Sequence, residues 1–266
     1  MKRARVAYSG NIHKAVEIDG RLKLDDGRII SENEVVWLPP VQPQTVFALG
    51  LNYADHAKEL AFNAPSEPLV FLKGPNTFIG HNAQARRPAD VTYMHYECEL
   101  AVVIGRQGRN IKRKDAYDYV AGYTIANDYA LRDYLENYYR PNLRVKNRDT
   151  CTPIGPWLVD AKDIDDPMQL TLRTYVNGEL TQEGTTRDMI FDIPALIEYL
   201  SSFMTLNEGD IILTGTPEGL TDTAVGDEIA TEIEGIGRLV NTIIGDDSFN
   251  CSTELNQIKK TTEQVK

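Results

Sequence analysis

The sequence has few cysteines and no long apolar run, and both absences narrow the class of protein. Its three cysteines lie far apart and lack metal-site spacing, which argues against a disulfide framework and predicts a reducing cytoplasm. No apolar run approaches the ~20 residues of a membrane span, and Met1-Lys2-Arg3-Ala4-Arg5 leads into no signal-type apolar core. We therefore expect a cytoplasmic protein that does not engage a membrane.

Positive charge is also scarce. Lys and Arg total 28 against 39 Asp and Glu, a net charge of −11, which argues against non-specific binding to nucleic acid or anionic lipid. The sequence has no His-Glu-x-x-His, so it has no zinc-protease helix, and its glycine loop at 214–219 lacks the Gly-Lys-Ser/Thr of a phosphate-binding loop. The remaining composition, 42% hydrophobic and 25% charged, is that of an ordinary globular protein.

Turn signals divide the chain into three parts. Residues 1–44 carry short alternating segments separated by Gly-Asn and Asp-Gly pairs, which predicts a small N-terminal β-region. Pro39-Pro40 and Pro43 then form a stiff connector. We expect a large main domain over 45–245 and a polar C-terminal tail over 246–266, without a core pattern.

Most of the regular structure predicted for the large domain is β. Apolar, mostly β-branched runs predict strands, whereas one 3.6-residue periodicity predicts a helix at Ile193 to Phe203. An Asn177-Gly178 pair predicts a tight hairpin. The fold class expected is therefore α+β, mostly β with some helix.

Two carboxylates open the most apolar strand. Glu97 and Glu99 point to one face because side chains alternate along a strand, about 6–7 Å apart. Asp128 ends a second predicted strand and is a natural third oxygen ligand. Such a cluster favours a hard divalent cation. Two alternatives are a frayed strand end with solvated glutamates and a helix cap at Asp128.

Several other side chains could serve a site. His56 and Glu59 are three residues apart, which suits acid–base work if the segment is a helix capped by Asn52 or Asp55. Taken alone, the pair is more ordinarily interpreted as two exposed side chains on one helix face. Lys73 ends an apolar strand and either reaches the surface or faces a site.

A basic run departs from the overall acidity. It contains four cations in nine residues, Arg140, Arg144, Lys146 and Arg148. The predominance of arginine favours carboxylate recognition. The alternatives are solvated loop charge and contact with an acidic surface of another subunit.

Three motifs in order carry a family resemblance. They are Glu97-x-Glu99, Gly122-Tyr123-x-x-x-Asn127-Asp128 and Gly209-Asp210-x-Ile212-x-Thr214-Gly215-Thr216-Pro217-x-Gly219. Together they resemble the fumarylacetoacetate hydrolase family over roughly residues 45 to 244. The resemblance implies a mixed β-sandwich roll and, in most cases, a homodimer.

The resemblance also implies roles for individual residues. Mg²⁺, or Mn²⁺ or Ca²⁺, would be bound by Glu97, Glu99 and Asp128. The catalytic set would be His56, Glu59 and Lys146. The substrate-binding set would be Lys73, Arg132, Arg140, Arg144, Gln182 and Thr216. Of these, Gln182 would come from a mobile loop and Thr216 would receive a substrate carboxylate.

Residues 132–149 are similar to one branch of the family, the isomerase/decarboxylases of 4-hydroxyphenylacetate catabolism. That similarity implies a small anionic 2-oxo acid as substrate and decarboxylation or isomerisation through a metal-chelated enolate. An acylpyruvate-type C–C hydrolase or an oxaloacetate decarboxylase of the same fold is an alternative, and a non-catalytic metal-stabilised binding module is another.

Overall fold

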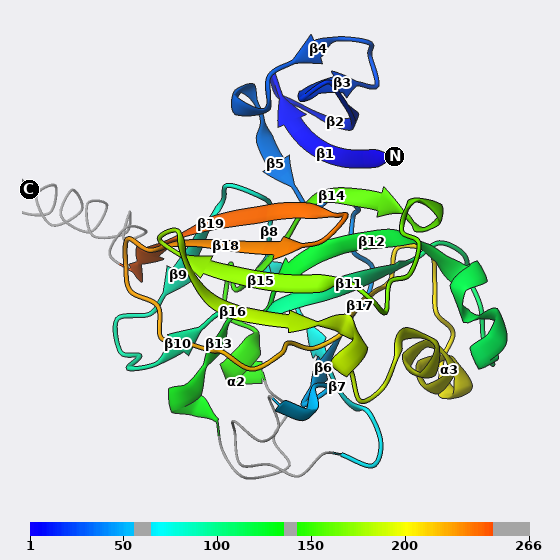
Figure 1. Cartoon of the computed structure of the whole chain (residues 1–266). Coiled ribbons are helices and arrows are strands. Elements are labelled where there is room, and N and C mark those ends of the chain that lie inside the picture. The colour runs from blue at the N-terminus through cyan, green and yellow to red at the C-terminus, as the bar shows by residue number, and fades with distance from the viewer. Residues whose placement is uncertain (56–64, 136–142, 247–266) are drawn as a thin grey trace, which may run out of the picture.

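The computed structural model describes residues 1–55, 65–135 and 143–246. A 12-stranded mixed sheet runs through the molecule in the order β4-β3-β2-β1-β14-β12-β11-β17-β6-β7, with β5 paired to β1 and β8 to β14 (Figure 1). Its strands are β1 Lys2–Tyr8, β2 Asn11–Ile18, β3 Arg21–Leu24, β4 Ile29–Ile30, β5 Val36–Leu38, β6 Val46–Gly50, β7 Leu69–Lys73, β8 Phe78–Ile79, β11 Cys98–Ile104, β12 Val120–Asn127, β14 Thr152–Asp160 and β17 Ile211–Leu213.

A second, five-stranded sheet lies over the centre of the first, in the order β16-β15-β18-β19-β9, and a two-stranded ladder joins β10 to β13. These strands are β9 Gln84–Arg87, β10 Met94–His95, β13 Ala130–Leu131, β15 Thr171–Val176, β16 Glu179–Thr185, β18 Glu228–Ile233 and β19 Gly237–Gly245. The two layers confirm the expected fold class, mostly β with little helix.

Short helical segments connect the strands. The α-helices that lie wholly within the described residues are α2 Leu143–Lys146 and α3 Ile193–Phe203. The 3-10 turns in the same ranges are η1 Glu32–Glu34, η2 Pro75–Thr77, η3 Arg113–Tyr119, η4 Arg132–Tyr134, η5 Ala161–Asp163 and η6 Thr186–Asp188. Helix α3 has the predicted bounds, and the Asp192 carboxylate caps it by accepting from the Ala195 N–H at 2.9 Å. Within the described ranges, no helix has the length and apolar content needed to cross a membrane.

Strand β11 lies at the centre of the core. Leu100, Val102 and Ile104 face the space between the two sheets, whereas Ala101 and Val103 join a smaller apolar cluster on the other face. Alternate residues therefore enter different clusters, as the two-residue period of a strand requires. Both faces are covered, which explains why the sequence is an uninterrupted apolar run.

The N-terminal β-region is continuous with the main sheet. Strand β1 pairs antiparallel with β14, placing Lys2 beside Val159, and the region stands above the larger body in Figure 1. The division at residue 44 stays a prediction, and most of the predicted tail lies outside the described residues.

Candidate metal centre and substrate site

The three acidic residues singled out in the sequence meet at the ends of two paired strands. Glu97 precedes β11, Glu99 lies within it, and Asp128 follows β12. The register aligns Cys98 with Asn127, and the Asp128 N–H donates to the Glu97 carbonyl at 2.9 Å. One carboxylate oxygen from each residue then lies within 4.8 Å of the others. The strand pairing itself therefore builds the cluster.

Burial makes this cluster electrostatically costly. The exposed fraction is 6% for Glu97 and 0% for Glu99 and Asp128. Burial, together with the neighbouring charges of Asp128 and Glu97, raises the pKa of Glu99 well above its usual value. The arrangement therefore favours a cation or a proton at Glu99.

Two lysines, one at the end of β7 and one at the end of α2, contact the cluster. Lys73, at the end of β7, places Nζ 2.5 Å from Asp128 Oδ1 and donates to the Lys146 carbonyl. Lys146, at the end of α2, places Nζ 2.5 Å from Glu97 Oε2 and 2.9 Å from Asp128 Oδ2. Burial alone would lower the pKa of Lys146, but the carboxylates outweigh it and raise the pKa, so Lys146 stays charged.

The polar atoms of Glu99 fit a divalent cation. Its Oε2 accepts the Gly215 N–H at 2.7 Å, whereas its Oε1 is buried with no hydrogen-bond partner among the described residues. Three carboxylates against two ammonium groups leave one unit of negative charge, and the cluster offers oxygen ligands. Hard cations such as Mg²⁺, Mn²⁺ and Ca²⁺ prefer such a set.

The loop after β17 carries the backbone N–H of Gly215, which donates to Glu99. Gly215 has φ +89°, a conformation that favours glycine, and a Cβ added to it would lie 3.0 Å from the Asn52 Cβ. Asn52 Nδ2 donates to the Thr214 carbonyl at 2.8 Å and to the Phe191 carbonyl at 3.0 Å. The buried Asn52 therefore fixes the peptide that carries the Gly215 N–H.

Thr216 belongs to a buried hydrogen-bonded chain. Gln182 Nε2 donates to Thr216 Oγ1 at 2.9 Å and to the Pro217 carbonyl at 2.8 Å, and Thr174 donates to Gln182 Oε1 at 2.8 Å. Because the Pro217 carbonyl can only accept, the orientation of the amide is fixed. The Thr216 hydroxyl accepts from Gln182, and its own hydrogen has no acceptor among the residues that the structure describes.

The position of Gln182 corrects one expectation. The resemblance implied a mobile loop, but Gln182 lies within strand β16, and its exposed fraction is only 2%. Its side chain is hydrogen-bonded to Thr174 in β15 and to Thr216 and Pro217 in the loop after β17.

The side chains of the basic run lie in different environments, because Lys146 is buried and Arg144 is exposed. Lys146 points into the carboxylate cluster, whereas the Arg144 guanidinium lies 3.7 Å from the centroid of the Tyr134 ring and that of Arg148 lies 5.1 Å from it. The Tyr134 hydroxyl in turn donates to Asp90 Oδ2 at 2.8 Å. Arg132 begins η4, the 3-10 turn that also contains Tyr134.

Three candidate residues lie outside the described residues, namely His56, Glu59 and Arg140. Sequence reasoning missed the parts of Asn52, Thr174 and Tyr134, because hydrogen bonds between distant segments leave no local pattern. A glycine after Thr214 was the one available signal, since it marks a close backbone approach.

Comparison with known proteins agrees with this geometry. A family model described as fumarylacetoacetate (FAA) hydrolase C-terminal matches residues 45–244. A protein from Salmonella dublin named 4-hydroxyphenylacetate degradation bifunctional isomerase/decarboxylase is 62% identical over 220 residues, 83% of this chain and 51% of that protein. The chain thus spans about half the length of that curated relative.

Two solved structures have the same fold. A 5-carboxymethyl-2-hydroxymuconate delta-isomerase from Mycobacterium smegmatis matches with TM-score 0.83 and 38% identity, covering 92% of this chain and 99% of the other. A maleylpyruvate hydrolase from Sphingobium sp. SYK-6, in complex with manganese(II) and pyruvate, matches with TM-score 0.79 and 28% identity over the same shares. The chain belongs to the fumarylacetoacetate hydrolase family.

Proposed function

We propose that the chain is a divalent-metal-dependent decarboxylase and isomerase acting on a 2-oxo or 2-hydroxy-diene di- or tricarboxylate of 4-hydroxyphenylacetate catabolism. The observation that carries the proposal is the buried cluster of Glu97, Glu99 and Asp128. Its surplus negative charge, and the Glu99 Oε1 that has no hydrogen-bond partner among the described residues, suit Mg²⁺ or Mn²⁺. The 62% identity to a protein named isomerase/decarboxylase supports the substrate class.

The cation would supply Lewis acidity at the 2-oxo group of the substrate. The residues of the chain perform the remaining tasks. Lys146 and Lys73 stay among the carboxylates and add positive charge beside the oxygen that becomes negative. Lys146 acts through its charge and not as a base, because its ammonium form is stabilised.

Substrate orientation is assigned to Thr216. Its hydroxyl oxygen accepts from Gln182, and its hydrogen, which has no acceptor in the described part of the chain, would donate to a substrate carboxylate. Arg132, Arg140 and Arg144 would attract the distal carboxylates of a strongly anionic substrate.

The proton step is assigned to His56 with Glu59. In the decarboxylation, the bond from carbon to the leaving carboxylate breaks, CO₂ departs, and the electron pair passes to the 2-oxo oxygen. A proton then returns to carbon from the His56 imidazolium, which Glu59 keeps charged. In the sequence, His56 is the fourth residue after Asn52, whose Nδ2 donates to the Thr214 carbonyl.

The test is CO₂ release from 5-oxopent-3-ene-1,2,5-tricarboxylate by the full chain with Mg²⁺ or Mn²⁺ and after EDTA treatment. We expect metal-dependent release, abolished in Glu99→Gln. Asp210→Asn is the matched control, since Asp210 is equally buried but binds the backbone of Thr45 and Asn207 instead. That control should keep metal-dependent turnover.

Other outcomes would redirect the proposal. Metal-dependent isomerisation of 2-hydroxyhepta-2,4-diene-1,7-dioate without CO₂ release would restrict it to the isomerase. Metal-dependent cleavage of an acylpyruvate alone would replace it with the hydrolase. Metal binding without turnover of any of these compounds would favour the alternative that the chain is a non-catalytic, metal-stabilised binding module. We further propose that the protein is cytoplasmic and forms a homodimer. Light scattering on the purified chain would measure the mass and so check the homodimer.

A further inference from the structure

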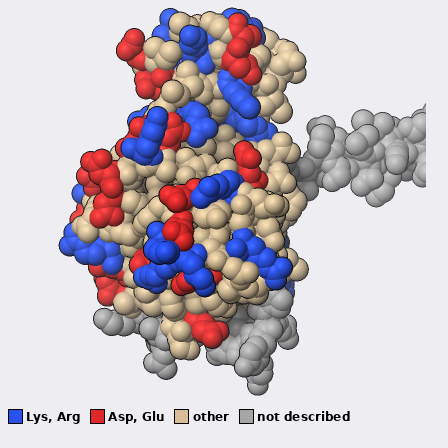
Figure 2. Space-filling model, turned by 90° about the vertical axis from the view of Figure 1, so that its right-hand side faces the viewer, with Lys and Arg blue, Asp and Glu red and all other residues tan. Residues whose placement is uncertain are grey.

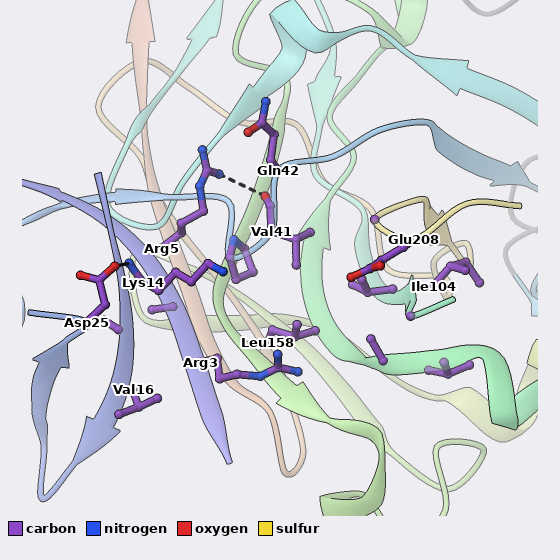
Figure 3. A pocket seen from close by; sticks show the side chains of 18 of the residues that line it. Arg3, Arg5, Lys14, Val16, Asp25, Val41, Gln42, Ile104, Leu158 and Glu208 are labelled. Carbon is purple, nitrogen blue, oxygen red and sulfur yellow. Dashed lines mark hydrogen bonds between the residues drawn. The ribbon is translucent and has the colours of Figure 1, made fainter. Parts of the chain in front are cut away.

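A second site candidate lies far from the carboxylates, between the N-terminal β-region and the body. The groove there encloses about 1220 Å³, somewhat above the ~300–1,000 Å³ of common small-molecule sites (Figure 3). One wall is the open face of strands β1, β2 and β3 at one end of the main sheet. The other wall is formed by residues of β11, β12 and β14 of the same sheet and by the connector that follows β5.

Where the open sheet face lines the groove, this part of the chain carries four cations and one acid, Asp25, whose carboxylate accepts from the Lys14 N–H at 3.3 Å and lies 2.8 Å from His13 Nδ1. In the strand register Arg3 lies beside Val16, Arg5 beside Lys14, and Val16 beside Lys23, so all five side chains share that face. The opposite face carries Ala4, Val6, Ala15, Leu22 and Leu24, which are buried. In a chain of net charge −11, four cations on one small face form a distinct positive surface. Figure 2 shows Lys and Arg side chains gathered where the two parts of the molecule meet.

These cations are not all used in holding the structure. Arg5 is engaged, because its Nη1 donates to the carbonyls of Pro39 and Val41. Arg3 bonds Asp160 at 2.5 Å, but its Nε is buried without a hydrogen-bond partner among the described residues. Lys14 and Lys23 are exposed, and within the same ranges no acid lies within ion-pair distance of either amine. Figure 3 shows Arg3 and Lys14 extending into the groove.

The facing wall is apolar. It presents Val41, Val103, Ala121 and Leu158, which belong to the smaller apolar cluster of the main sheet or pack against it. At the far side lie two acids, Glu208 and Asp118, and one cation, Arg106, whose Nη2 is 3.9 Å from Asp118 Oδ2. A ligand in the groove would therefore meet positive charge at one end, apolar surface along its body and negative charge beyond.

We propose that this groove binds a small monoanion with a flat apolar body, of the aryl monocarboxylate class. The carboxylate would pair with Lys14, Lys23 and the free Nε of Arg3, and the ring would lie on Val41 and Leu158. A second carboxylate at the opposite end would face Glu208 and the Asp118–Arg106 pair, which disfavours linear dicarboxylates. The site is separate from the carboxylate cluster, and the proposal does not depend on the reaction proposed above.

The test uses phenylacetate as the probe in isothermal titration calorimetry of the full chain. EDTA is present throughout, so that coordination to a metal at the carboxylate cluster cannot contribute. We expect saturable binding of phenylacetate and at least tenfold weaker binding of benzyl alcohol, which lacks the charge, and of succinate, which carries two. Equal affinity for all three, or no saturable heat with phenylacetate, would overturn the proposal.

Variants then place the probe. Lys14→Gln combined with Lys23→Gln should raise the dissociation constant at least fivefold, and Lys14→Arg should keep it near the original value. Arg109→Gln is the matched control, because Arg109 is exposed and does not line the groove. The double variant changes only exposed side chains, and its thermal unfolding would verify the fold. Unchanged phenylacetate affinity in the folded double variant would contradict the groove as the site.

Discussion

Two cations of the basic run, Lys146 and Arg144, are only two residues apart but belong to opposite environments. Lys146 is buried, and its ammonium contacts Glu97, the Asp128 carboxylate and the Asp128 carbonyl, which occupies three donors. Arg144 is exposed and lies on the face of Tyr134. The first belongs to the interior cluster, and the second belongs to its rim.

The difference follows from the chemistry of the two side chains. An ammonium is a compact point charge that can sit among several oxygens, whereas a guanidinium is planar and stacks on aromatic rings. The four-residue helix α2 turns Lys146 inward and leaves Arg144 outside. A run of like charges in a sequence therefore does not say which member enters a site.

The largest expected effect comes from removing the interior cation. Lys146→Met leaves three buried carboxylates with Lys73 alone, and loss of one partner of a buried ion pair costs about 3–5 kcal/mol. We expect the free energy of unfolding in urea, measured with EDTA at pH 8, to fall by that amount. Added Mn²⁺ should recover part of it.

The control for this variant is Lys162→Met, which removes an exposed lysine from η5 and should change stability by less than ~0.5 kcal/mol. An unfolding free energy for Lys146→Met within ~1 kcal/mol of the original protein would mean that the carboxylates accept protons easily and do not need this ammonium.

An intermediate effect, on Mn²⁺ affinity, tests the hydrogen bonds by which Asn52 holds the loop that contacts Glu99. Asn52→Asp removes the donor to the Thr214 carbonyl and places negative charge beside it, so the Gly215 N–H should shift away from Glu99. Loss of a group that orients a metal ligand lowers affinity by about 10–100-fold. Calorimetric titration with Mn²⁺ should show a rise in the dissociation constant of at least that lower figure.

A matched control separates this effect from simple loss of stability. Asn241 is as buried as Asn52, and its Nδ2 donates to the carbonyls of Gly80 and Ala83, away from the cluster. Asn241→Asp should therefore lower the melting temperature but leave the Mn²⁺ affinity unchanged. Equal loss of Mn²⁺ affinity in both variants would assign Asn52 a structural role only.

The sequence predicted the cluster of buried carboxylates better than it predicted the residues that hydrogen-bond around it. The spacing of Glu97 and Glu99 and the strand ending at Asp128 sufficed, because alternation and strand pairing are local rules. Helix α3 and the Asn177-Gly178 hairpin were confirmed for the same reason, with φ of 51° and 84° in the turn.

Other features depend on contacts between distant segments, which local patterns do not encode. The pairing of β1 with β14 joins residues more than 150 positions apart, and Asn52 joins segments near 191 and 214. Gln182 follows a hairpin turn and a glycine follows it soon after, which resembles a loop, yet the pairing of β16 with β15 makes it a strand. Propensity gives way there to tertiary context.

The smallest expected effect is at the rim. Arg144→Gln removes one exposed guanidinium from Tyr134, which should lower the free energy of unfolding by only ~0.5–1 kcal/mol. If Arg144 attracts the distal carboxylate of the substrate, KM should rise about two- to fivefold with kcat unchanged, since exposed charge pairs contribute at most about 1 kcal/mol. Steady-state kinetics of Arg144→Gln against the exposed control Arg109→Gln would measure this. A fall in kcat instead would place Arg144 at the reacting centre and remove the distinction between interior and rim.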